Sequence, residues 1–388
     1  MNQQRSAAPT PQSSIYLHFP FCSKLCGYCD FHKELFDRRR ERLFFDALLR
    51  ETELAAPEAQ GSEIATVYVG GGTPSLMSLE RFAEWIAALQ RLYRFAERVE
   101  FTVELNPESA QRENLAAFRE LGVNRLSIGV QSFDADALKL LDRRHNITDT
   151  LRVFYLARAL GYEDFSADLI FGLPNQTLAG LQSDLEQLVE IEPTHISYYQ
   201  LTVKENTPLE RLVADGEIRL PDDDTLSVFY RAGVDFLADH GYERYEVSSF
   251  TKPGFQSQHN LRYWRGEPYL GLGPGAHGFT GSERYANVSD TTAYVESLMT
   301  DRKRPLIVDP RSERDQMVEE IMLGLRLSAG IERQRFFARH GKHVIDLVNK
   351  SEYKHLVESG LLIPGARSLR LSDDALALAD EITARLLS

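Results

Sequence analysis

The sequence predicts an α/β protein built mainly on a parallel β-sheet, followed by a smaller helical domain. Short runs rich in β-branched and aromatic residues alternate with longer amphipathic runs over roughly the first 240 residues. After about residue 250 this alternation stops, and mostly helical patterns follow. Six strand–helix units in succession are typical of a parallel sheet with right-handed crossover connections.

The six predicted strands alternate with predicted helices in chain order. Within residues 79–93, for example, apolar side chains recur at the spacing of one helix face. Six such units are compatible with a partly closed barrel or with an open, doubly wound sheet. The predicted strands are residues 14–19, 65–70, 99–105, 125–130, 165–172 and 195–203. The predicted helices are residues 38–56, 79–93, 110–121, 134–142, 148–160, 178–191 and 223–239.

The C-terminal part has a different pattern. QSQHNLRYWRGEPYLGLGPGAHGF (256–279) is rich in glycine and aromatic residues and is predicted to be a loop. A helix over 315–328, two or three further helices and a short hairpin suggest a small winged-helix-like domain. Residues 310–388 contain 12 Lys plus Arg and 12 Asp plus Glu, so we expect a lid or docking module rather than a DNA-binding domain. The expected organisation is a flexible tail (1–13), a barrel (14–250), a barrel extension (251–309) and this C-terminal domain (310–388).

Composition excludes several classes of protein. Of 388 residues, 44 are Lys or Arg and 57 are Asp or Glu, so the net charge is 44 − 57 = −13, which argues against nucleic-acid binding. The chain lacks an apolar run of about 18 residues, which predicts no membrane span. The first residues, MNQQRSAAPTPQSS, do not resemble a signal peptide. Three clustered cysteines are no disulfide framework and indicate a reducing, cytoplasmic location.

All three cysteines lie in FPFCSKLCGYCDFH (19–32), just after the first predicted strand. Cys22, Cys26 and Cys29 can converge on one metal centre. One reading is a structural zinc site with His32 as the fourth ligand, and another is three incidental thiols. A third reading is an iron–sulfur cluster that lacks one protein thiolate, which leaves one iron open to another ligand.

Polar groups follow the other predicted strands. The turn GGGTPS (70–75) comes directly after the second strand, and its glycines would let the backbone approach a ligand closely. In parallel α/β folds, functional groups collect at the carboxyl ends of the strands. The third to sixth strands place polar residues at or near this edge: Glu104, Gln131, Asp168 and Tyr199.

Together these motifs resemble the radical S-adenosylmethionine (SAM) superfamily, and within it the oxygen-independent coproporphyrinogen oxidase group. The resemblance implies a partial (β/α)6 barrel and a [4Fe–4S] cluster held by Cys22, Cys26 and Cys29. It also implies that SAM binds the open iron and contacts Tyr16, Tyr28, Gly71, Gly72, Thr73, Glu104, Gln131, Arg143 and Asp168. Without the resemblance, Arg143 beside Arg144 reads as a solvated helix face and Asp168 as a buried turn residue.

Three features make the chain most similar to the HemW haem chaperones of this group. The oxidases have a further cysteine two residues after the cluster motif, where this chain has Phe31, and their N-terminus is longer. HNLRYW (259–264) matches an element associated with HemW proteins, so His259 is a candidate axial haem ligand. The alternative is a purely structural role, in which this motif braces the mouth of the barrel. His277 is expected to line the SAM site.

The resemblance therefore implies haem binding and delivery to apo-haemoproteins, with cluster and SAM as integral parts. It assigns no catalytic residue, and an electron donor is required only if SAM is cleaved. Two alternatives remain open. One is oxidative decarboxylation of coproporphyrinogen by an oxidase of the same group, and the other is radical SAM chemistry on an unrelated substrate.

Overall fold

The computed structural model describes residues 11–388. Residues 1–10 of the predicted flexible tail lie outside the described residues. The first strand, β1 (Gln12–Phe19), already includes the last two residues that the sequence assigned to that tail. No helix within residues 11–388 has both the length and the apolar character needed to cross a membrane.

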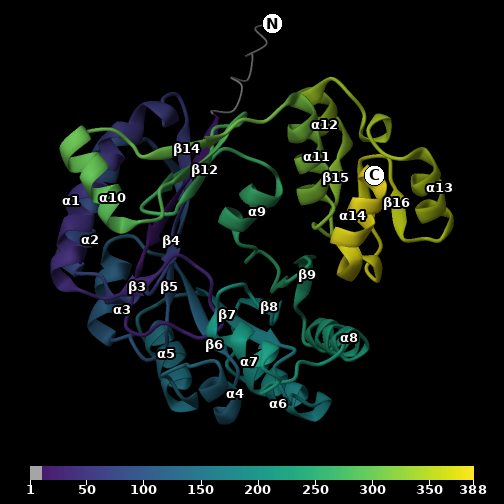
Figure 1. Cartoon of the computed structure of the whole chain (residues 1–388), viewed down its shortest axis with the longest axis horizontal. Helices are drawn as coiled ribbons and strands as arrows, with labels where there is room; N and C mark the ends of the chain where they lie inside the picture. The colour runs from purple at the N-terminus through teal and green to yellow at the C-terminus, as the bar shows by residue number, and fades with distance from the viewer. Residues whose placement is uncertain (1–10) are drawn as a thin grey trace, which may run out of the picture.

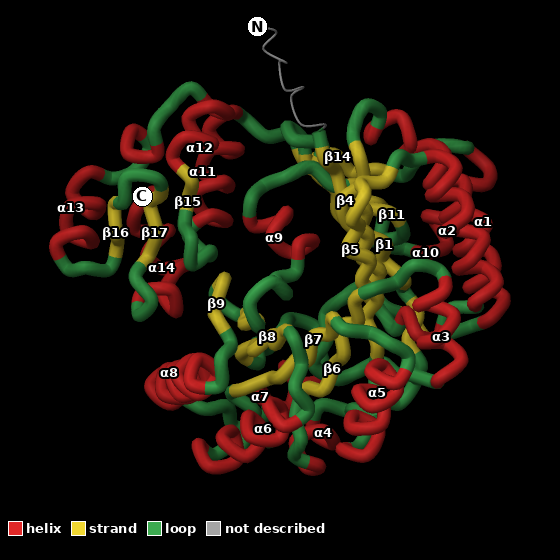
Figure 2. The backbone as a smooth tube through the Cα atoms, turned by 180° about the vertical axis from the view of Figure 1, so that it is seen from behind, coloured by secondary structure: helices red, strands yellow, loops and turns green. Residues whose placement is uncertain are grey.

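A nine-stranded sheet forms the main domain, with the order β11-β1-β4-β5-β6-β7-β8-β10-β9. The six central strands are parallel and follow chain order, as the sequence predicts. Figure 2 shows the sheet curving into an open barrel with helices on its outer side. The predicted α/β fold class is confirmed. These strands are β1, β4 (Glu63–Gly71), β5 (Phe95–Leu105), β6 (Arg125–Gln131), β7 (Asp164–Phe171) and β8 (His195–Gln200).

The outer helices bury one apolar face each against the sheet. In α2 (Leu79–Leu92), for example, the buried positions Phe82, Trp85, Ile86 and Leu89 repeat at helical spacing. Side-chain caps fix several N-termini, as where the Asn146 carboxamide accepts from the Asp149 amide in a capping box. The other helices of the barrel are α1 (Arg38–Ala55), α3 (Arg112–Glu120), α4 (Ala135–Leu140), α5 (Ile147–Ala159), α6 (Leu178–Glu190), α7 (Pro208–Ala214) and α8 (Asp223–Asp239).

Residues 251–309 complete the barrel. β11 (Leu270–Leu272) pairs in parallel with β1, and β10 (Ser249–Thr251) and β9 (Glu243–Glu246) extend the other edge in antiparallel fashion. The segment predicted to be a loop contains a helix, α9 (Gln258–Trp264), so that prediction is wrong. In Figure 1, α9 lies at the open side of the barrel, next to β9 and the C-terminal helices. A separate three-stranded sheet follows: β12 (His277–Phe279), β13 (Arg284–Asn287) and β14 (Leu306–Asp309).

A buried carboxylate ties this extension to α1. Glu51 is fully buried and accepts hydrogen bonds from the Tyr294 hydroxyl (2.7 Å) and the Asn287 carboxamide (2.7 Å). The Arg304 guanidinium lies 3.3 Å from the same carboxylate. A buried charge is tolerated only when it is paired and hydrogen-bonded, as here, so these contacts fix the extension against the barrel wall.

The C-terminal domain has its own apolar core and a three-stranded sheet of order β15-β17-β16. It packs against the sheet edge at β9, where Glu246 and Leu327 form an isolated antiparallel bridge. An uncovered edge strand invites pairing with another chain, so the domain protects this edge. Its elements are α11 (Glu313–Gly324), β15 (Ile331–Glu332), α12 (Arg333–His340), α13 (Lys350–Glu358), β16 (Leu362–Pro364), β17 (Ser368–Leu371) and α14 (Ala379–Leu387).

Candidate cofactor-binding site

The cysteine loop is anchored at both ends. Its strands β2 (Phe21–Cys22) and β3 (Glu34–Leu35) pair in parallel, and the Phe36 amide donates to the Cys22 carbonyl (2.9 Å). The Phe21 ring is fully buried and packs edge-on against Phe44, with ring centroids 5.9 Å apart. These contacts leave the residues between β2 and β3 to present their side chains to the barrel interior.

All three free thiols line a cavity of about 610 Å³ at the carboxyl ends of the strands. Within residues 11–388, no three His, Cys, Asp or Glu side chains are grouped so that they could hold a single metal ion. His32, the proposed fourth ligand of a zinc site, lines a different cavity. The arrangement therefore gives no support to a mononuclear zinc site.

The same cavity collects most of the residues expected to contact SAM. Burial disfavours the phenolate form of Tyr28 and raises the pKa of its hydroxyl to about 12. Tyr199 is exposed toward the cavity, and Gln131 ends β6 in a left-handed conformation, with φ of 67°. Besides the thiols, the expected residues that line the cavity are Tyr28, Gly71, Gly72, Thr73, Glu104, Gln131, Arg143, Asp168 and Tyr199.

Arg143 lies beside the thiols and is not a solvated surface residue. One Nη donates to the Asn106 side-chain oxygen (2.7 Å) and to the Gly129 carbonyl (3.2 Å), and the other lies 3.9 Å from Cys26 Sγ. Its buried Nε has no hydrogen-bond partner within the described residues. A guanidinium that lines a cavity beside three thiols is suited to an anionic ligand group.

Two carboxyl groups face the middle of the cavity. Glu104 accepts hydrogen bonds from the Tyr68 hydroxyl (2.8 Å) and the Gly71 amide (3.1 Å). Burial raises the pKa of Glu104 to about 7, and the nearby Asp168 adds to the shift. Burial likewise raises the pKa of Asp168 to about 6. The pair can therefore accept hydrogen bonds when ionised, or share protons near neutral pH.

The glycine turn is also required by packing within the protein. A Cβ on Gly72 would lie 2.5 Å from the Phe21 carbonyl oxygen, and one on Gly71 would lie 2.7 Å from the His18 ring. Gly71 also has φ of 105°, which favours glycine. Both glycines line the cavity as well, and the predicted close approach of a ligand to them stays a prediction.

Sequence reasoning missed the residues that support this site. Asn106 holds both Arg143 and the Thr73 hydroxyl, which accepts from the Asn106 side-chain nitrogen at 3.0 Å. Gly129 leaves room for the Gln131 and Arg143 side chains, which a Cβ would meet at 2.8 and 3.4 Å. The position of Asn106 directly after the third predicted strand is the one signal that could have identified it.

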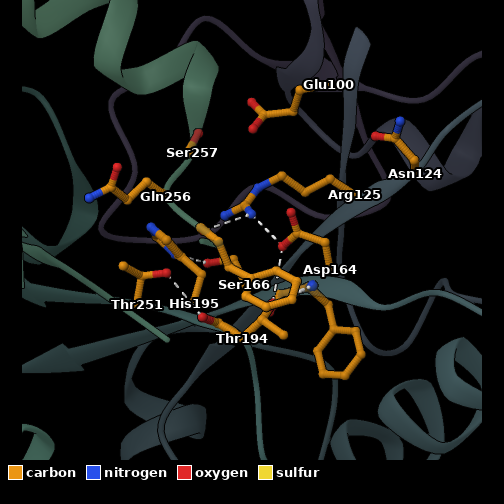
Figure 3. Close-up of polar contacts among 12 residues, drawn as sticks. Glu100, Asn124, Arg125, Asp164, Ser166, Thr194, His195, Thr251, Gln256 and Ser257 are labelled. Atoms are coloured by element: carbon orange, nitrogen blue, oxygen red, sulfur yellow. Dashed lines mark hydrogen bonds and ion pairs between the residues drawn. The ribbon is translucent and has the colours of Figure 1, made fainter. Parts of the chain in front are cut away.

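A buried polar cluster lies at the deep end of the cavity (Figure 3). Arg125 is only 2% exposed and pairs with Asp164. The His195 ring is bonded to the Ser166 hydroxyl (2.7 Å) and the Tyr245 hydroxyl (2.8 Å), and burial lowers its pKa well below the usual value. The polar side chains of this cluster therefore have partners within the protein, and the His195 ring is neutral.

Neither Tyr16 nor His259 lines this cavity. His259 is fully buried, with Nδ1 bonded to the Thr66 hydroxyl (2.7 Å) and Nε2 to the Tyr263 hydroxyl (2.7 Å). Burial lowers its pKa to about 3, so the ring is neutral. Both ring nitrogens are occupied, and an iron could bind Nε2 only by displacing Tyr263. These hydrogen bonds match the alternative in which the HNLRYW motif braces the mouth of the barrel.

Tyr16 instead lines a second cavity, of about 640 Å³. His277 also lines this second cavity and not the first one, and its predicted position beside SAM stays a prediction. The two cavities have four lining residues in common: Asp30, Phe31, Gly71 and Glu104. Phe31 is 63% exposed although it is aromatic, so its ring is available at the boundary between them.

Comparisons with known proteins agree with this geometry. Residues 16–188 match the family model of the radical SAM superfamily, and residues 312–378 match that of the HemN C-terminal domain. Heme chaperone HemW of Bacillus subtilis is 34% identical over 95% of this chain and 97% of its own length. Heme chaperone HemW of Escherichia coli is 40% identical over 69% of this chain and 70% of its own.

Among solved structures, coproporphyrinogen III oxidase (HemN) from Escherichia coli superposes with a TM-score of 0.82 and 22% identity. The match covers 98% of this chain and 90% of that enzyme, and at this identity it establishes the shared fold alone. Sequence identity over nearly the whole chain identifies the closer relationship. This chain belongs to the HemW family of the radical SAM superfamily.

Proposed function

We propose that this chain is a haem chaperone that binds haem and passes it to apo-haemoproteins, with a [4Fe–4S] cluster and SAM bound in the cavity lined by the three thiols. Its relatives of similar length are named heme chaperones. The observation that carries the proposal is the cavity that gathers the three thiols, with the exposed Phe31 ring at its boundary. An aromatic ring can pack on a flat macrocycle, whereas a cysteine would bring a further thiol to the site.

The residues present fit the cofactors that the superfamily implies. Cys22, Cys26 and Cys29 would hold the cluster, which when bound leaves one iron for the amino and carboxylate groups of SAM. The Arg143 guanidinium, which lines this cavity, would bind the SAM carboxylate through a charge-assisted hydrogen bond. Glu104 and Asp168 would accept from the ammonium and hydroxyl groups of SAM, and these contacts would favour the ionised carboxylates.

The alternative function is oxidative decarboxylation of coproporphyrinogen. The fold is compatible with it, because the structural neighbour is a coproporphyrinogen III oxidase, but no specific residue of this chain favours it. One experiment separates the two. The full chain is reconstituted anaerobically with iron and sulfide, then divided for a haem titration and a decarboxylation assay with SAM, a reductant and coproporphyrinogen III. We expect haem binding without protoporphyrinogen formation. Rapid product formation would replace the proposal with the oxidase function.

Haem delivery requires its own measurement, because binding alone does not make a chaperone. Haem-loaded protein is mixed with an apo-haemoprotein, and the acceptor is separated by size and examined for haem absorption. Transfer faster than from free haem would support delivery. An acceptor that takes up haem equally fast from buffer would contradict it. The same assay with and without reductant tests whether an electron donor is required.

A further inference from the structure

The second cavity has the properties of a site for a large, flat ligand. Its volume of about 640 Å³ lies within the range of about 300–1,000 Å³ that is usual for small-molecule and cofactor sites. Aromatic and aliphatic side chains supply much of its lining, and two of them are strongly exposed: Phe31 by 63% and Ile307 by 61%. The lining also includes the phenol rings of Tyr16, Tyr263 and Tyr269.

Three imidazoles line the same cavity, but they are not equivalent. His18 is buried, with Nδ1 bonded to the Tyr16 hydroxyl (3.0 Å) and Nε2 to the His32 carbonyl (2.7 Å). His32 is half-buried, and its Nε2 lies 3.4 Å from the Thr291 hydroxyl. His277 is exposed, and its ring has no hydrogen-bond or ion-pair partner among residues 11–388.

The backbone holds His277 firmly while leaving its ring free. β12 pairs with β13, and His277 lies directly opposite Ala286, whose small side chain also lines the cavity. The segment before it is equally fixed, because the Ala276 amide and carbonyl are both bonded, to Gly273 (3.2 Å) and to the Asn287 amide (2.9 Å). A free imidazole on a rigid strand is what an axial ligand to haem iron requires.

We infer that the second cavity is the haem site and that the imidazole of His277 is the axial ligand of the haem iron. The inference rests on the proposed function and names a different ligand from His259, both of whose nitrogens are bonded inside the protein. Porphyrin supplies four nitrogen ligands, so one protein imidazole is enough. The described lining residues include no Lys or Arg but do include Asp30 and Glu104, so the negatively charged propionates would have no cationic partner in the lining and would favour solvent.

The test is a haem titration of the full, anaerobically reconstituted chain, followed by absorption and electron paramagnetic resonance. His277→Ala should lose or shift the spectrum of histidine-ligated haem, and added imidazole should restore it. His355→Ala removes another exposed imidazole, on α13 in the C-terminal domain, and should leave the spectrum unchanged. Iron and sulfide content confirms that each variant retains the cluster.

The outcomes separate the inference from the function on which it rests. A wild-type protein that binds no haem would overturn the proposed function itself. Wild-type haem binding with an unaltered spectrum and affinity in His277→Ala would overturn the assignment of His277 only. His259→Ala provides the decisive comparison. If the spectrum of histidine-ligated haem is lost in that variant but kept in His277→Ala, the axial ligand is His259 of α9.

Discussion

Arg143 owes its position in the lining of the cavity to three contacts of its Nη atoms. Arg143→Ala should weaken SAM binding by about 1.5–3 kcal/mol, because it removes a charge-assisted hydrogen bond. Titration calorimetry on cluster-loaded protein measures the change. Arg144→Ala is the matched control, since the neighbouring side chain is exposed and does not line the cavity. Equal SAM affinity in both variants would remove Arg143 from the site.

Glu104 makes the ligand-free protein sensitive to pH. Its pKa rises from the ordinary value of 4.5 to about 7 on folding, so the protonated form stabilises the folded state. That contribution is complete below about pH 4.5 and is lost as the pH rises through about 7. Glu104→Gln should therefore flatten the pH dependence of the free energy of unfolding between pH 5 and 8, by on the order of 2 kcal/mol.

Denaturant unfolding at several pH values measures this effect. Glu97→Gln is the control, because Glu97 is exposed on the same strand, β5. Asp168 contributes in the same direction, so some dependence on pH remains in the variant. Identical pH profiles for the wild type and Glu104→Gln would show that Glu104 is ionised in the folded protein throughout this range.

At the scale of elements, the turn after β4 depends on glycine for packing. Gly72→Ala should destabilise the fold by about 1–3 kcal/mol, because the added Cβ meets the backbone of Phe21 and cannot be relieved by a side-chain rotation. Gly180→Ala provides the contrast within α6, where the nearest atom is the Thr177 hydroxyl oxygen at 3.4 Å. There alanine should be neutral or stabilising. Thermal unfolding of both variants tests the difference.

The same scale shows what the sequence can and cannot predict. All six central strands follow from local periodicity, because each is an apolar run followed by an amphipathic helix, but their order in the sheet does not, since six such units fit a barrel or a doubly wound sheet. The helix α9 was not predicted from local periodicity. A residue distant in the sequence contacts its first turn, since the Glu100 carboxylate accepts hydrogen bonds from the backbone amides of Gln258 and His259, both at 2.8 Å. No local pattern around residue 258 records that contact.

The candidate site divides in the same way. The cysteines and the polar strand ends, such as Glu104 and Asp168, could be identified because motif and strand end coincide in the sequence. The hydrogen-bond partners of His259 could not be predicted in this way. Thr66 lies on the distant strand β4, and Tyr263 lies further along α9, a helix that the sequence pattern did not predict. The position of His277 in a separate cavity depends on how β12 and β13 pair, which composition does not specify.

At the scale of the whole molecule, the sequence predicted that the C-terminal domain is a lid or a docking module. None of residues 310–388 lines the cavity of the three thiols, and the domain packs against the edge of the sheet. Trp264 of α9 stands in the contact, with the Arg326 guanidinium 5.1 Å from its ring centre. The position of this domain therefore affects the stability of the barrel edge more directly than it affects ligand access.

Trp264→Ala should uncouple the two domains. Removing the ring leaves Arg326 without its aromatic partner and opens the small apolar cluster of Tyr245, Leu261 and Leu327. We expect calorimetric unfolding to broaden or split into two transitions, with cluster content and SAM affinity unchanged. Phe337→Ala, which removes an exposed ring on α12, is the control. A single, unshifted transition in Trp264→Ala would show that the contact does not couple the domains.

The wall between the two cavities has a thermodynamic consequence. Phe31, Gly71, Asp30 and Glu104 each face both spaces, so an occupant on one side alters the surroundings of an occupant on the other. Any resulting change in affinity is reciprocal: if SAM raises or lowers the haem affinity by some factor, haem changes the SAM affinity by the same factor. A single wall of four residues would then link the state of the cofactor to the retention of the cargo.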